Sequence, residues 1–483
     1  MKNVCLSALA IAAFLTSATA CKKGGDSPTA VVEPTKTEPT VSVWVTTGNQ
    51  SELLKKRSDI GFAKNLTGDF VTIDTAQHFQ QIDGIGAAMT GSSAYLFSKK
   101  LTTAQRDAIM KELFTTNGIG ISYLRLTIGA SDFSLKDFSY NDLQEGQTDP
   151  NQQQFSMAEE QTDLLPMLKK VKAVSSEVKM MGSPWSPPAW MKTNNSFIQG
   201  EVKTEHYQAF ANYLAKYVKT MEAEGLPLHA ITIENEPQNR DAGYMSMIMS
   251  AEQQRDFIKN NLGPTFVNQN ITTKILTWDH NWDKPEYPMT ILQDPDAAQY
   301  VAGSAFHGYG GEPEAMSTVH NAYPEKGLYF TEISGGDWSP DFSGNLMWHM
   351  EKVLLGTMKN WSKSVIYWNL ALDENHGPKN KGCGDCRGVI TIPSSGNGKI
   401  IRNVEYYLLG HTAKFIRPGA YRVSSEGLTD SNIKYLAFVN PDGSKVVVAL
   451  NKGNADKAVN FKSGARTFRY VLPANGVTTL TWK

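Results

Sequence analysis

Residues 230–237, Ala-Ile-Thr-Ile-Glu-Asn-Glu-Pro, combine an apolar strand with an acidic turn. The apolar run 231–233 predicts a buried parallel strand, and Glu236 follows its C-terminal end. Proteins with a β/α-barrel keep their chemistry at that end of the strands. A second glutamate, Glu332, follows another strand-like run, 328–331. A pair of strand-end glutamates is what the hydrolysis of a glycosidic bond requires, with one as general acid and one as nucleophile.

The segment from about residue 80 to residue 416 alternates short apolar strands with amphipathic helices. This alternation predicts an α/β fold whose parallel strands close into a (β/α)8 TIM barrel. The helical pattern is plainest at 207–221, before Gly225 and Pro227 end that helix. The expected barrel strands are 83–88, 121–128, 178–182, 230–234, 274–278, 303–307, 328–331 and 364–370.

The chain after Pro418 changes to short alternating strands, which predicts a small antiparallel β-sandwich. Residues 41–47 and 70–73 share this pattern. We therefore expect a barrel over 80–416 and a discontinuous sandwich built from both chain ends, 41–79 and 417–483. The expected C-terminal strands are 434–440, 445–450, 458–461, 467–472 and 477–482.

The N-terminus has the pattern of an export signal. Lys2 precedes the apolar stretch 6–15, and Ala18-Thr19-Ala20 stands directly before Cys21. We expect residues 1–20 to be a signal peptide, Cys21 to be the lipid anchor of a bacterial lipoprotein, and 21–40 to be a flexible tether. Plain secretion is the alternative. The expected product is an exported monomer of the cell envelope, which contacts a membrane only through its anchor and faces the periplasm or the surface from the outer membrane.

Charged residues are balanced, with 47 Lys and Arg against 48 Asp and Glu. This balance, without a basic cluster, argues against a nucleic-acid partner. The 10 Trp suit subsites that stack on sugar rings, although large cores also use Trp.

Cys383 and Cys386 form a lone C-x-x-C pattern in residues 382–387. A zinc site normally takes four ligands, and only His376 is close in sequence. Surroundings typical of a thioredoxin-like redox pair are also absent. We expect a short-range disulfide from an oxidising compartment, and we expect no metal and no cofactor.

The neighbours of the two glutamates suggest their roles. Asn235 can donate a hydrogen bond to a sugar 2-hydroxyl, and Pro237 fixes the turn that points Glu236 inward. We expect Glu236 to be a general acid whose pKa is raised by a less polar setting. Glu332 has to be ionised to attack the anomeric carbon, and we expect Arg125 to hold its pKa down.

Other strand ends carry side chains suited to sugar binding. Candidate contacts are a stacking tryptophan in the Pro-rich loop 182–190, a carboxylate that could bind two hydroxyls, and polar or aromatic groups after the sixth and eighth strands. A lone Trp or His more often packs in a core, but these residues share one rim. They are Asp132, Trp185, His307, Tyr309, Trp368 and Asn369, and Arg125 and Asn235 complete the candidate substrate-binding residues.

With these motifs the chain resembles glycoside hydrolase family 30, a family of clan A barrels. The resemblance covers essentially the whole expected mature chain. It implies that Glu236 is the acid/base and Glu332 the nucleophile, and that Asp132, Trp185, Asn235, His307, Tyr309 and Trp368 line the glycone subsite. The matching stretches are 44–47, 83–90, Arg125, 131–134, 183–185, 192–194, 234–237, 307–309, 331–332, 368–372 and 410–416.

The sequence departs from the family pattern in two places. Gly91 stands where many members carry Asp, so position 91 is given no role. The Cys383–Cys386 loop is not a feature of the animal glucosylceramidases and is associated with the β-1,6-glucanase branch. Because loops after barrel strands set specificity, this loop disfavours a ceramide substrate.

These observations predict a retaining glycoside hydrolase that acts on a β-linked glucan or another β-glucoside, most simply an endo-β-1,6-glucanase. Glucosylceramidase and β-glucosidase or β-xylosidase are alternatives within the family. A non-catalytic glycan-binding lipoprotein is a different class, which the presence of both glutamates disfavours. The last alternative is a metal-dependent hydrolase that uses Cys383, Cys386 and His376.

Overall fold

The computed structural model describes residues 40–483 of the chain. The expected signal peptide, the expected lipid anchor Cys21 and residues 22–39 of the expected tether lie outside the described residues and stay predictions. Within residues 40–483, none of the helices combines the length and the apolar composition needed to cross a bilayer.

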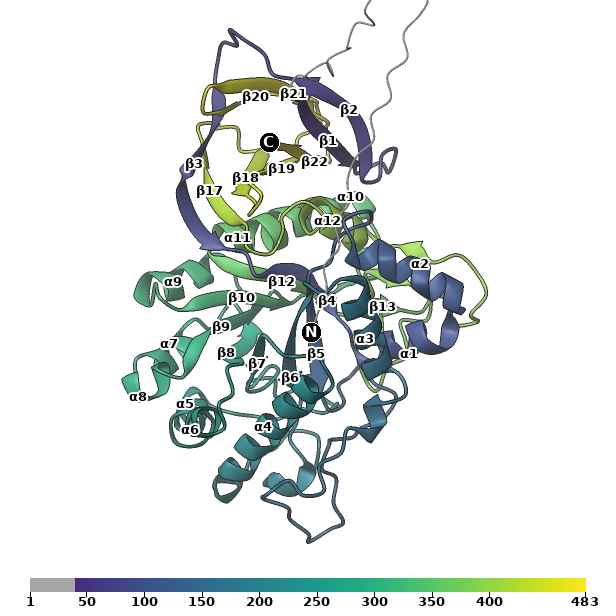
Figure 1. Cartoon of the computed structure of the whole chain (residues 1–483), viewed down its shortest axis with the longest axis vertical. Helices are drawn as coiled ribbons and strands as arrows, with labels where there is room; N and C mark the ends of the chain where they lie inside the picture. Colours follow the sequence, from purple (N-terminus) through teal and green to yellow (C-terminus); the bar gives the residue numbers. More distant parts are fainter. Residues whose placement is uncertain (1–39) are drawn as a thin grey trace, which may run out of the picture. The chain divides into compact units, whose positions relative to one another are not determined.

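Parallel strands close into a barrel in the order β10-β12-β4-β5-β6-β7-β8-β9, which confirms the predicted fold class (Figure 1). The strands are buried along nearly their whole length, as expected for parallel strands covered on both faces. They are β4 (Gly84–Ala88), β5 (Tyr123–Ile128), β6 (Lys179–Pro184), β7 (Ala230–Thr232), β8 (Lys274–Asn281), β9 (Val301–His307), β10 (Gly327–Glu332) and β12 (Ser362–Tyr367).

Helices follow the barrel strands and form the outer layer of the barrel (Figure 1). The α-helices are α1 (Gly91–Tyr95), α2 (Thr103–Phe114), α3 (Leu164–Val174), α4 (Tyr207–Ala223), α5 (Ala251–Phe257), α6 (Gly263–Asn268), α7 (Glu286–Leu292), α8 (Pro295–Ala298), α9 (Glu314–Ala322), α10 (Phe342–Trp348), α11 (Gly356–Lys359) and α12 (Val404–Thr412). Three π-helical turns, η1 (Leu96–Lys100), η5 (Ile258–Leu262) and η6 (His349–Leu355), join neighbouring helices, and η2 (Ala158–Glu160), η3 (Ala189–Met191) and η4 (Thr204–His206) are short 3₁₀ turns.

The strand ends differ from the expected ones at the C-terminal rim of the barrel. β7 ends at Thr232, so Glu236 lies in the following turn rather than next to the strand. β10 includes Glu332 as its last residue, and β8 continues past Trp278 to Asn281. These differences arise because the rim strands are irregular, as described below for the site.

A second sheet combines strands from both ends of the described chain, in the order β2-β1-β22-β19-β18-β17-β3-β20-β21. The prediction missed two of its strands, β2 and β17. Its strands pair in the predicted antiparallel manner except for β3 and β20, which pair in parallel. Its members are β1 (Thr40–Thr47), β2 (Lys55–Gly61), β3 (Phe70–Gln81), β17 (Tyr421–Glu426), β18 (Ile433–Val439), β19 (Lys445–Asn451), β20 (Lys457–Ser463), β21 (Arg466–Leu472) and β22 (Gly476–Trp482).

Five short strands outside the barrel and the second sheet complete the described fold. β11 (Gly335–Gly336) pairs with β14 (Cys386–Arg387). β13 (Ala371–Leu372), β15 (Ile390–Thr391) and β16 (Ile401–Arg402) form a separate small sheet. The β11–β14 pair connects the loops that follow β10 and β12, and the three-stranded sheet lies within the segment that follows β12.

His411 in α12 joins the second sheet to the barrel. Its ring nitrogens form hydrogen bonds of 2.8 and 2.9 Å with the hydroxyls of Thr46 in β1 and Thr479 in β22. Burial lowers the pKa of His411 to about 3, so the ring is neutral and offers one donor and one acceptor. This polar contact, together with α10 to α12 lying between the two sheets in Figure 1, fixes the sandwich against the barrel.

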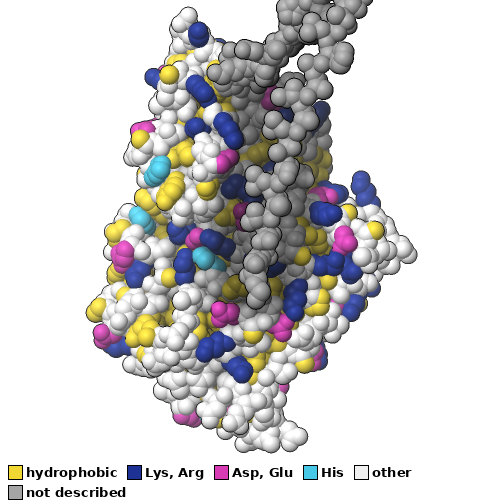
Figure 2. All heavy atoms as spheres, in the orientation of Figure 1, with side chains coloured by type: hydrophobic (Ala, Val, Ile, Leu, Met, Phe, Trp, Pro, Cys, Tyr) yellow, Lys and Arg dark blue, Asp and Glu magenta, His cyan; other side chains and the backbone are white. Residues whose placement is uncertain are grey.

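Acidic and basic side chains are interspersed over the face shown in Figure 2. Many form exposed pairs, such as Lys169 with Glu224 and Lys136 with Glu159. Such pairs contribute little to the free energy of unfolding. Because their charges are opposite, they create no extended region of positive or negative surface potential.

Candidate active site

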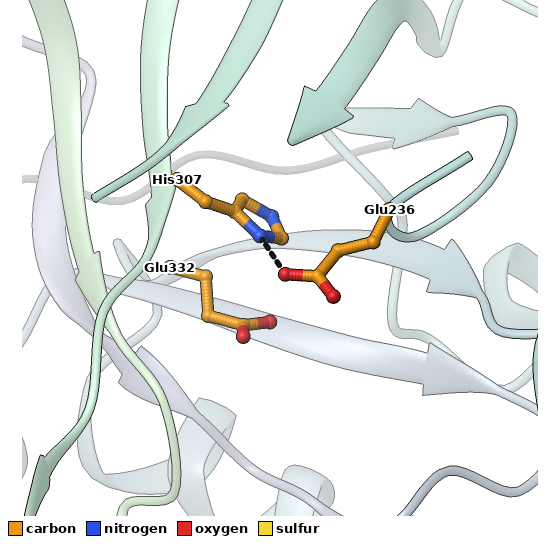
Figure 3. A group of neighbouring side chains, drawn as sticks. All are labelled: Glu236, His307 and Glu332. Atoms are coloured by element: carbon orange, nitrogen blue, oxygen red, sulfur yellow. Dashed lines mark hydrogen bonds and ion pairs between the residues drawn. The ribbon is translucent and has the colours of Figure 1, made fainter. Parts of the chain in front are cut away.

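The carboxyl groups of Glu236 and Glu332 point toward one another, with His307 beside them (Figure 3). Glu332 ends β10, Glu236 lies in the turn after β7, and His307 ends β9. Three polar side-chain atoms, a carboxylate oxygen from each glutamate and a ring nitrogen of His307, all lie within 4.8 Å of one another. The two carboxyl groups are therefore close enough for direct attack by one of them on a carbon whose substituent is protonated by the other.

The backbone around these residues is strained. Glu236 has φ 54°, and the consecutive residues Trp278 and Asp279 have φ 71° and 68°. Left-handed conformations of this kind cost on the order of 1 kcal/mol or more each for residues other than glycine. The hydrogen bond from Glu236 N to Asp279 O, 3.0 Å long, joins two of these positions. The strain is thus held by contacts between neighbouring strand ends.

Irregular strand pairing turns the functional side chains inward. The register between β8 and β9 shifts between Trp278 and His280, and the register between β9 and β10 shifts before Glu332. A bulge re-directs the side chains that follow it. In regular strands these two side chains would point away from the barrel interior. The register shifts turn Asp279 and Glu332 inward.

Asp279 is a fully buried carboxylate that binds both cations of the site. It pairs with Arg125 Nη2 at 2.8 Å and with His307 Nε2 at 3.0 Å. Hydroxyl groups donate the remaining hydrogen bonds: Thr331 to Oδ1, and Ser183 and Thr232 to Oδ2. Burial alone would raise its pKa, but the charge of Arg125 and the hydrogen bond from His307 hold the pKa of Asp279 well below its usual range.

His307 lies between two carboxylates. Its Nδ1 is 3.0 Å from Glu236 Oε1, and its Nε2 is bound to Asp279. Burial lowers the pKa of His307, but the charge of Glu332 and the hydrogen bonds to Asp279 and Glu236 raise it to about 9. The ring is therefore a cation at neutral pH and donates from both nitrogens.

This cation reverses the expected order of the two glutamate pKa values. Burial raises the pKa of Glu236, but the hydrogen bond and the charge of His307 outweigh it and hold that pKa low, at about 2. The prediction of a raised pKa for Glu236 in the free enzyme is thus wrong, because it overlooked His307. The proton is held instead on the His307 side of the Nδ1–Oε1 hydrogen bond.

Glu332 is bound by Arg125 Nη1 and accepts a hydrogen bond of 3.0 Å from the Tyr309 hydroxyl. Burial raises the pKa of Glu332, against the charges of His307 and Arg125, and the charge of Glu236 adds to the rise. Arg125 therefore acts in the expected direction, but it does not bring the pKa of Glu332 below its usual value. The direct ion pair with Arg125 nevertheless favours the ionised form.

Glu236, His307 and Glu332 have the donor atoms of a metal site. Both nitrogens of His307 already donate to carboxylates, and a protonated imidazole is no metal ligand. Arg125 supplies a second fixed positive charge next to Glu332. The cluster is arranged to hold a proton between carboxylates.

The site opens into a cavity of about 620 Å³. Of the residues expected on this rim, the cavity is lined by Asp132, Glu236, Tyr309, Glu332 and Trp368. Asn235 is 5 % exposed and lies just beneath, where its Oδ1 accepts a hydrogen bond of 2.7 Å from Arg125.

Four residues expected to bind substrate lie behind the cavity wall, which corrects the expectation of direct contact. Arg125, His307 and Asn369 are fully buried and Trp185 is 2 % exposed. Trp185 stacks under Trp368 with ring centroids 5.0 Å apart, and Arg125 lies 4.9 Å from the Trp185 ring. Asn369 accepts a hydrogen bond of 2.9 Å from Thr90. These side chains position the lining rather than form it.

Asp132 offers an unused acceptor to a ligand. Its Oδ1 has no hydrogen-bond partner among residues 40–483, although the residue is only 8 % exposed. Burial raises the pKa of Asp132 well above its usual range, and the charges of Glu332 and Glu236 add to the effect. A buried polar atom without a partner is costly, so sugar hydroxyls at this position would relieve that cost.

A disulfide joins Cys383 to Cys386 and forms part of the cavity wall. Because both sulfur atoms are in this bond, neither is a thiolate ligand, and the alternative of a metal site with His376 is not supported. His376 instead donates from Nδ1 to the Cys386 carbonyl at 3.0 Å.

Several functional side chains were not found from the sequence. Asp279 follows the expected strand 274–278 directly, as Glu332 follows its own strand, and this signal could have been used. Asn239 donates to Glu236 Oε2 at 2.8 Å, and Tyr244 lines the cavity. Both lie on an irregular loop, where sequence periodicity carries no information about direction.

Comparison with known proteins gives two family matches along the chain. Residues 82–416 match the TIM-barrel domain of glycosyl hydrolase family 30, and residues 419–480 match the β-sandwich domain of the same family. Together the matches cover well over half of the chain.

Curated relatives and solved structures agree with these matches. The chain is 32% identical over 430 residues to an endo-1,6-β-D-glucanase of Trichoderma harzianum, covering 84% of this chain and 85% of that protein. It is 30% identical over 451 residues to lysosomal acid glucosylceramidase of Mus musculus, covering 86% and 84%. A solved endo-β1,6-glucanase structure aligns with TM-score 0.86 and 37% identity, over 92% of this chain and 99% of that chain.

The buried charges predict the effect of Asp279→Asn. Because Asp279 helps to raise the pKa of His307, the substitution lowers that pKa. The proton on the His307–Glu236 pair is then lost at a lower pH, so the alkaline limb of the kcat/KM profile on an aryl β-glucoside shifts to lower pH. Unpaired buried cations also destabilise the fold by about 3 to 5 kcal/mol.

The matched control is Asp283→Asn, an exposed residue near the same strand end. It leaves both the profile and the denaturant midpoint unchanged. If the Asp279→Asn enzyme keeps the alkaline limb of the wild-type kcat/KM profile, this result contradicts the assignment of the proton to His307.

Proposed function

The chain belongs to glycosyl hydrolase family 30, and on this premise we propose that it is a retaining endo-β-1,6-glucanase. The observation that carries the mechanism is the approach of the Glu236 and Glu332 carboxyl groups to within 4.8 Å, atom to atom. Retaining glycosidases keep their carboxyl groups about 5 to 5.5 Å apart, whereas inverting ones need room for a water molecule.

In the first step Glu332 attacks the anomeric carbon and forms a glycosyl ester. Arg125 favours the ionised form of this carboxylate, and the Tyr309 hydroxyl orients it. The bond from the anomeric carbon to the leaving oxygen breaks, and that oxygen takes a proton from Glu236. Asn235 Nδ2 is available to donate to the sugar 2-hydroxyl, an interaction that strengthens in the transition state.

The proton for this step is held by the His307–Glu236 pair. In the free enzyme it lies on His307, and the 3.0 Å hydrogen bond carries it to Glu236 as the leaving oxygen draws it away. Among the charges and hydrogen bonds that raise the pKa of His307, the charge of Glu332 contributes most. This charge is lost when the ester forms. Bond formation at Glu332 therefore favours release of the proton from His307.

In the second step water takes the place of the leaving group. Glu236 is now ionised and accepts a proton from the attacking water, and Glu332 leaves as a carboxylate. His307, left neutral by the first step, takes this proton back through the same 3.0 Å hydrogen bond, so the resting charges of the pair are restored. Two inversions at the anomeric carbon give net retention.

The proposed linkage rests on the likeness to endo-1,6-β-glucanases over most of the chain. The Cys383–Cys386 disulfide supports it, since it forms a cavity wall at the rim where loops determine specificity. The same likeness extends to a glucosylceramidase, so ceramide glucoside is the alternative that the substrate test has to exclude.

The two glutamate variants are expected to fail at different steps. Glu332→Gln has no nucleophile and loses about 10³-fold or more of its turnover on every substrate. Glu236→Ala still forms the ester from an activated aryl β-glucoside but stalls in its hydrolysis, so added azide restores turnover and gives β-glycosyl azide. Circular dichroism establishes that both variants are folded. A folded Glu236→Ala enzyme that ignores azide would contradict its role as acid/base.

The substrate prediction is that pustulan, a β-1,6-glucan, is cleaved to short gentio-oligosaccharides. We expect its kcat/KM to exceed that for glucosylceramide at least tenfold, which requires only about 1.4 kcal/mol of differential transition-state binding. Laminarin and xylan, digested separately and chromatographed, are the controls for linkage and sugar. Efficient release of ceramide with pustulan intact would favour the glucosylceramidase alternative.

We further propose that the enzyme is an exported lipoprotein, supported by the pattern before Cys21 and the Pro- and Thr-containing segment after it. Such a tether suits a monomeric enzyme that meets glycans outside the cell. Full-length protein expressed in a bacterium should label with palmitate and stay in the membrane fraction, and Cys21→Ala should abolish the labelling. Unlabelled wild-type protein in the medium would favour plain secretion.

A further inference from the structure

Trp338 is a large aromatic side chain left open to solvent at the mouth of the active-site cavity. It is 54 % exposed and lines the same cavity as Glu236 and Glu332. It lies in the loop that leads from β10 to α10, six positions after Glu332. An exposed tryptophan in a concave, otherwise polar site is a feature that a ligand would cover.

The backbone at Gly336 leaves room for the Trp338 ring. A Cβ atom on Gly336 would lie 1.9 Å from the Trp338 ring, so only glycine allows the indole to pack there. Gly336 is itself fixed by β11, which pairs with β14, and it faces Cys386 in that pairing. The edge of the indole thus rests on the strand pair whose other strand carries the disulfide.

Polar contacts on both sides hold the loop in place. Asp337 N donates to Asp385 O at 2.9 Å, inside the disulfide loop. Arg387 donates to the Gly336 carbonyl and forms an ion pair of 2.8 Å with the buried Glu405. On the far side, Asn345 donates to Ser339 O at 2.7 Å. Trp338 is exposed but its backbone is anchored, which reduces the entropy cost of binding to it.

The position of Trp338 separates it from the glycone pocket. Trp368 and Asp132, which suit the sugar that is attacked, are 4 % and 8 % exposed. Trp338 and Tyr309 are 54 % and 46 % exposed and Tyr244 is half-buried, so these three cavity-lining rings lie nearer to solvent than Trp368 and Asp132. Tyr244 contacts Asn239, which binds the acid/base Glu236, so this end of the cavity is the side on which the leaving oxygen is protonated.

We propose that Trp338 is the stacking platform for the glucose unit on the leaving-group side of the scissile bond. The apolar C–H face of a pyranose covers the indole while its hydroxyls stay in water. This assignment rests on the proposed retaining mechanism and deepens it. The same platform holds an acceptor sugar after the first step, when its hydroxyl can attack the glycosyl ester in place of water, giving its proton to Glu236 and releasing Glu332.

The test compares Trp338→Ala with Trp338→Phe and with Trp348→Ala. Trp348 is the matched control, because it is 44 % exposed on α10 but does not line the cavity. On a β-1,6-gluco-oligosaccharide, Trp338→Ala should lose about tenfold or more in kcat/KM, and Trp338→Phe should keep most of it. On 4-nitrophenyl β-glucoside, which has no sugar on the leaving-group side, all variants should stay within about twofold of wild type.

A second measurement uses the aryl glucoside as donor and gentiobiose as acceptor. The ratio of transfer product to free glucose should fall in Trp338→Ala and stay at the wild-type value in Trp348→Ala. Equal losses on both substrates would place Trp338 in the glycone pocket, and no loss on either would leave it without a role; both results overturn the assignment. If wild type does not cleave β-1,6-glucan, the linkage proposal fails, and the transfer measurement still decides for Trp338.

Discussion

The site depends on Asp279, a fully buried carboxylate that holds two cations inside the barrel. Arg125 and His307 would each be costly to bury alone, and Asp279 neutralises part of both charges while three hydroxyls complete its hydrogen bonds. Arg125 then holds Glu332, the proposed nucleophile, and His307 holds Glu236, the proposed acid/base. The Glu236 and Glu332 carboxyl groups are thus positioned through two cations that one buried carboxylate holds in place.

The strained backbone is the consequence of this requirement. Asp279 and Glu236 both adopt left-handed conformations, and a hydrogen bond joins their backbones. Regular strands would direct alternate side chains away from the barrel axis, so bulges at the ends of β8 and β10 are needed to bring these carboxylates together. The rest of the barrel core, densely packed with buried apolar side chains, supplies the stability that keeps such conformations populated.

The outer parts of the molecule act on the cavity through its rim. The disulfide, the β11–β14 pair and the Arg387–Glu405 ion pair fix the loops after β10 and β12. The sandwich is tied to α12 by neutral His411, and α12 follows those same loops in the chain. The cavity wall is therefore rigid where it carries Trp338 and the cystine, which is what selection between sugars at the open end requires.

The sequence by itself determined the eight barrel strands, the sandwich built from both chain ends, and the glutamates at two strand ends, because periodicity and strand-end position are local properties of the chain. Only the tertiary structure decided which side chains line the cavity and where the proton lies. Arg125, Trp185, His307 and Asn369 have residue types that suit a sugar, yet they lie beneath the surface. The pKa of Glu236 depends on His307, 71 positions away, and electrostatic coupling across a buried site is set by distance in space, which sequence spacing does not contain.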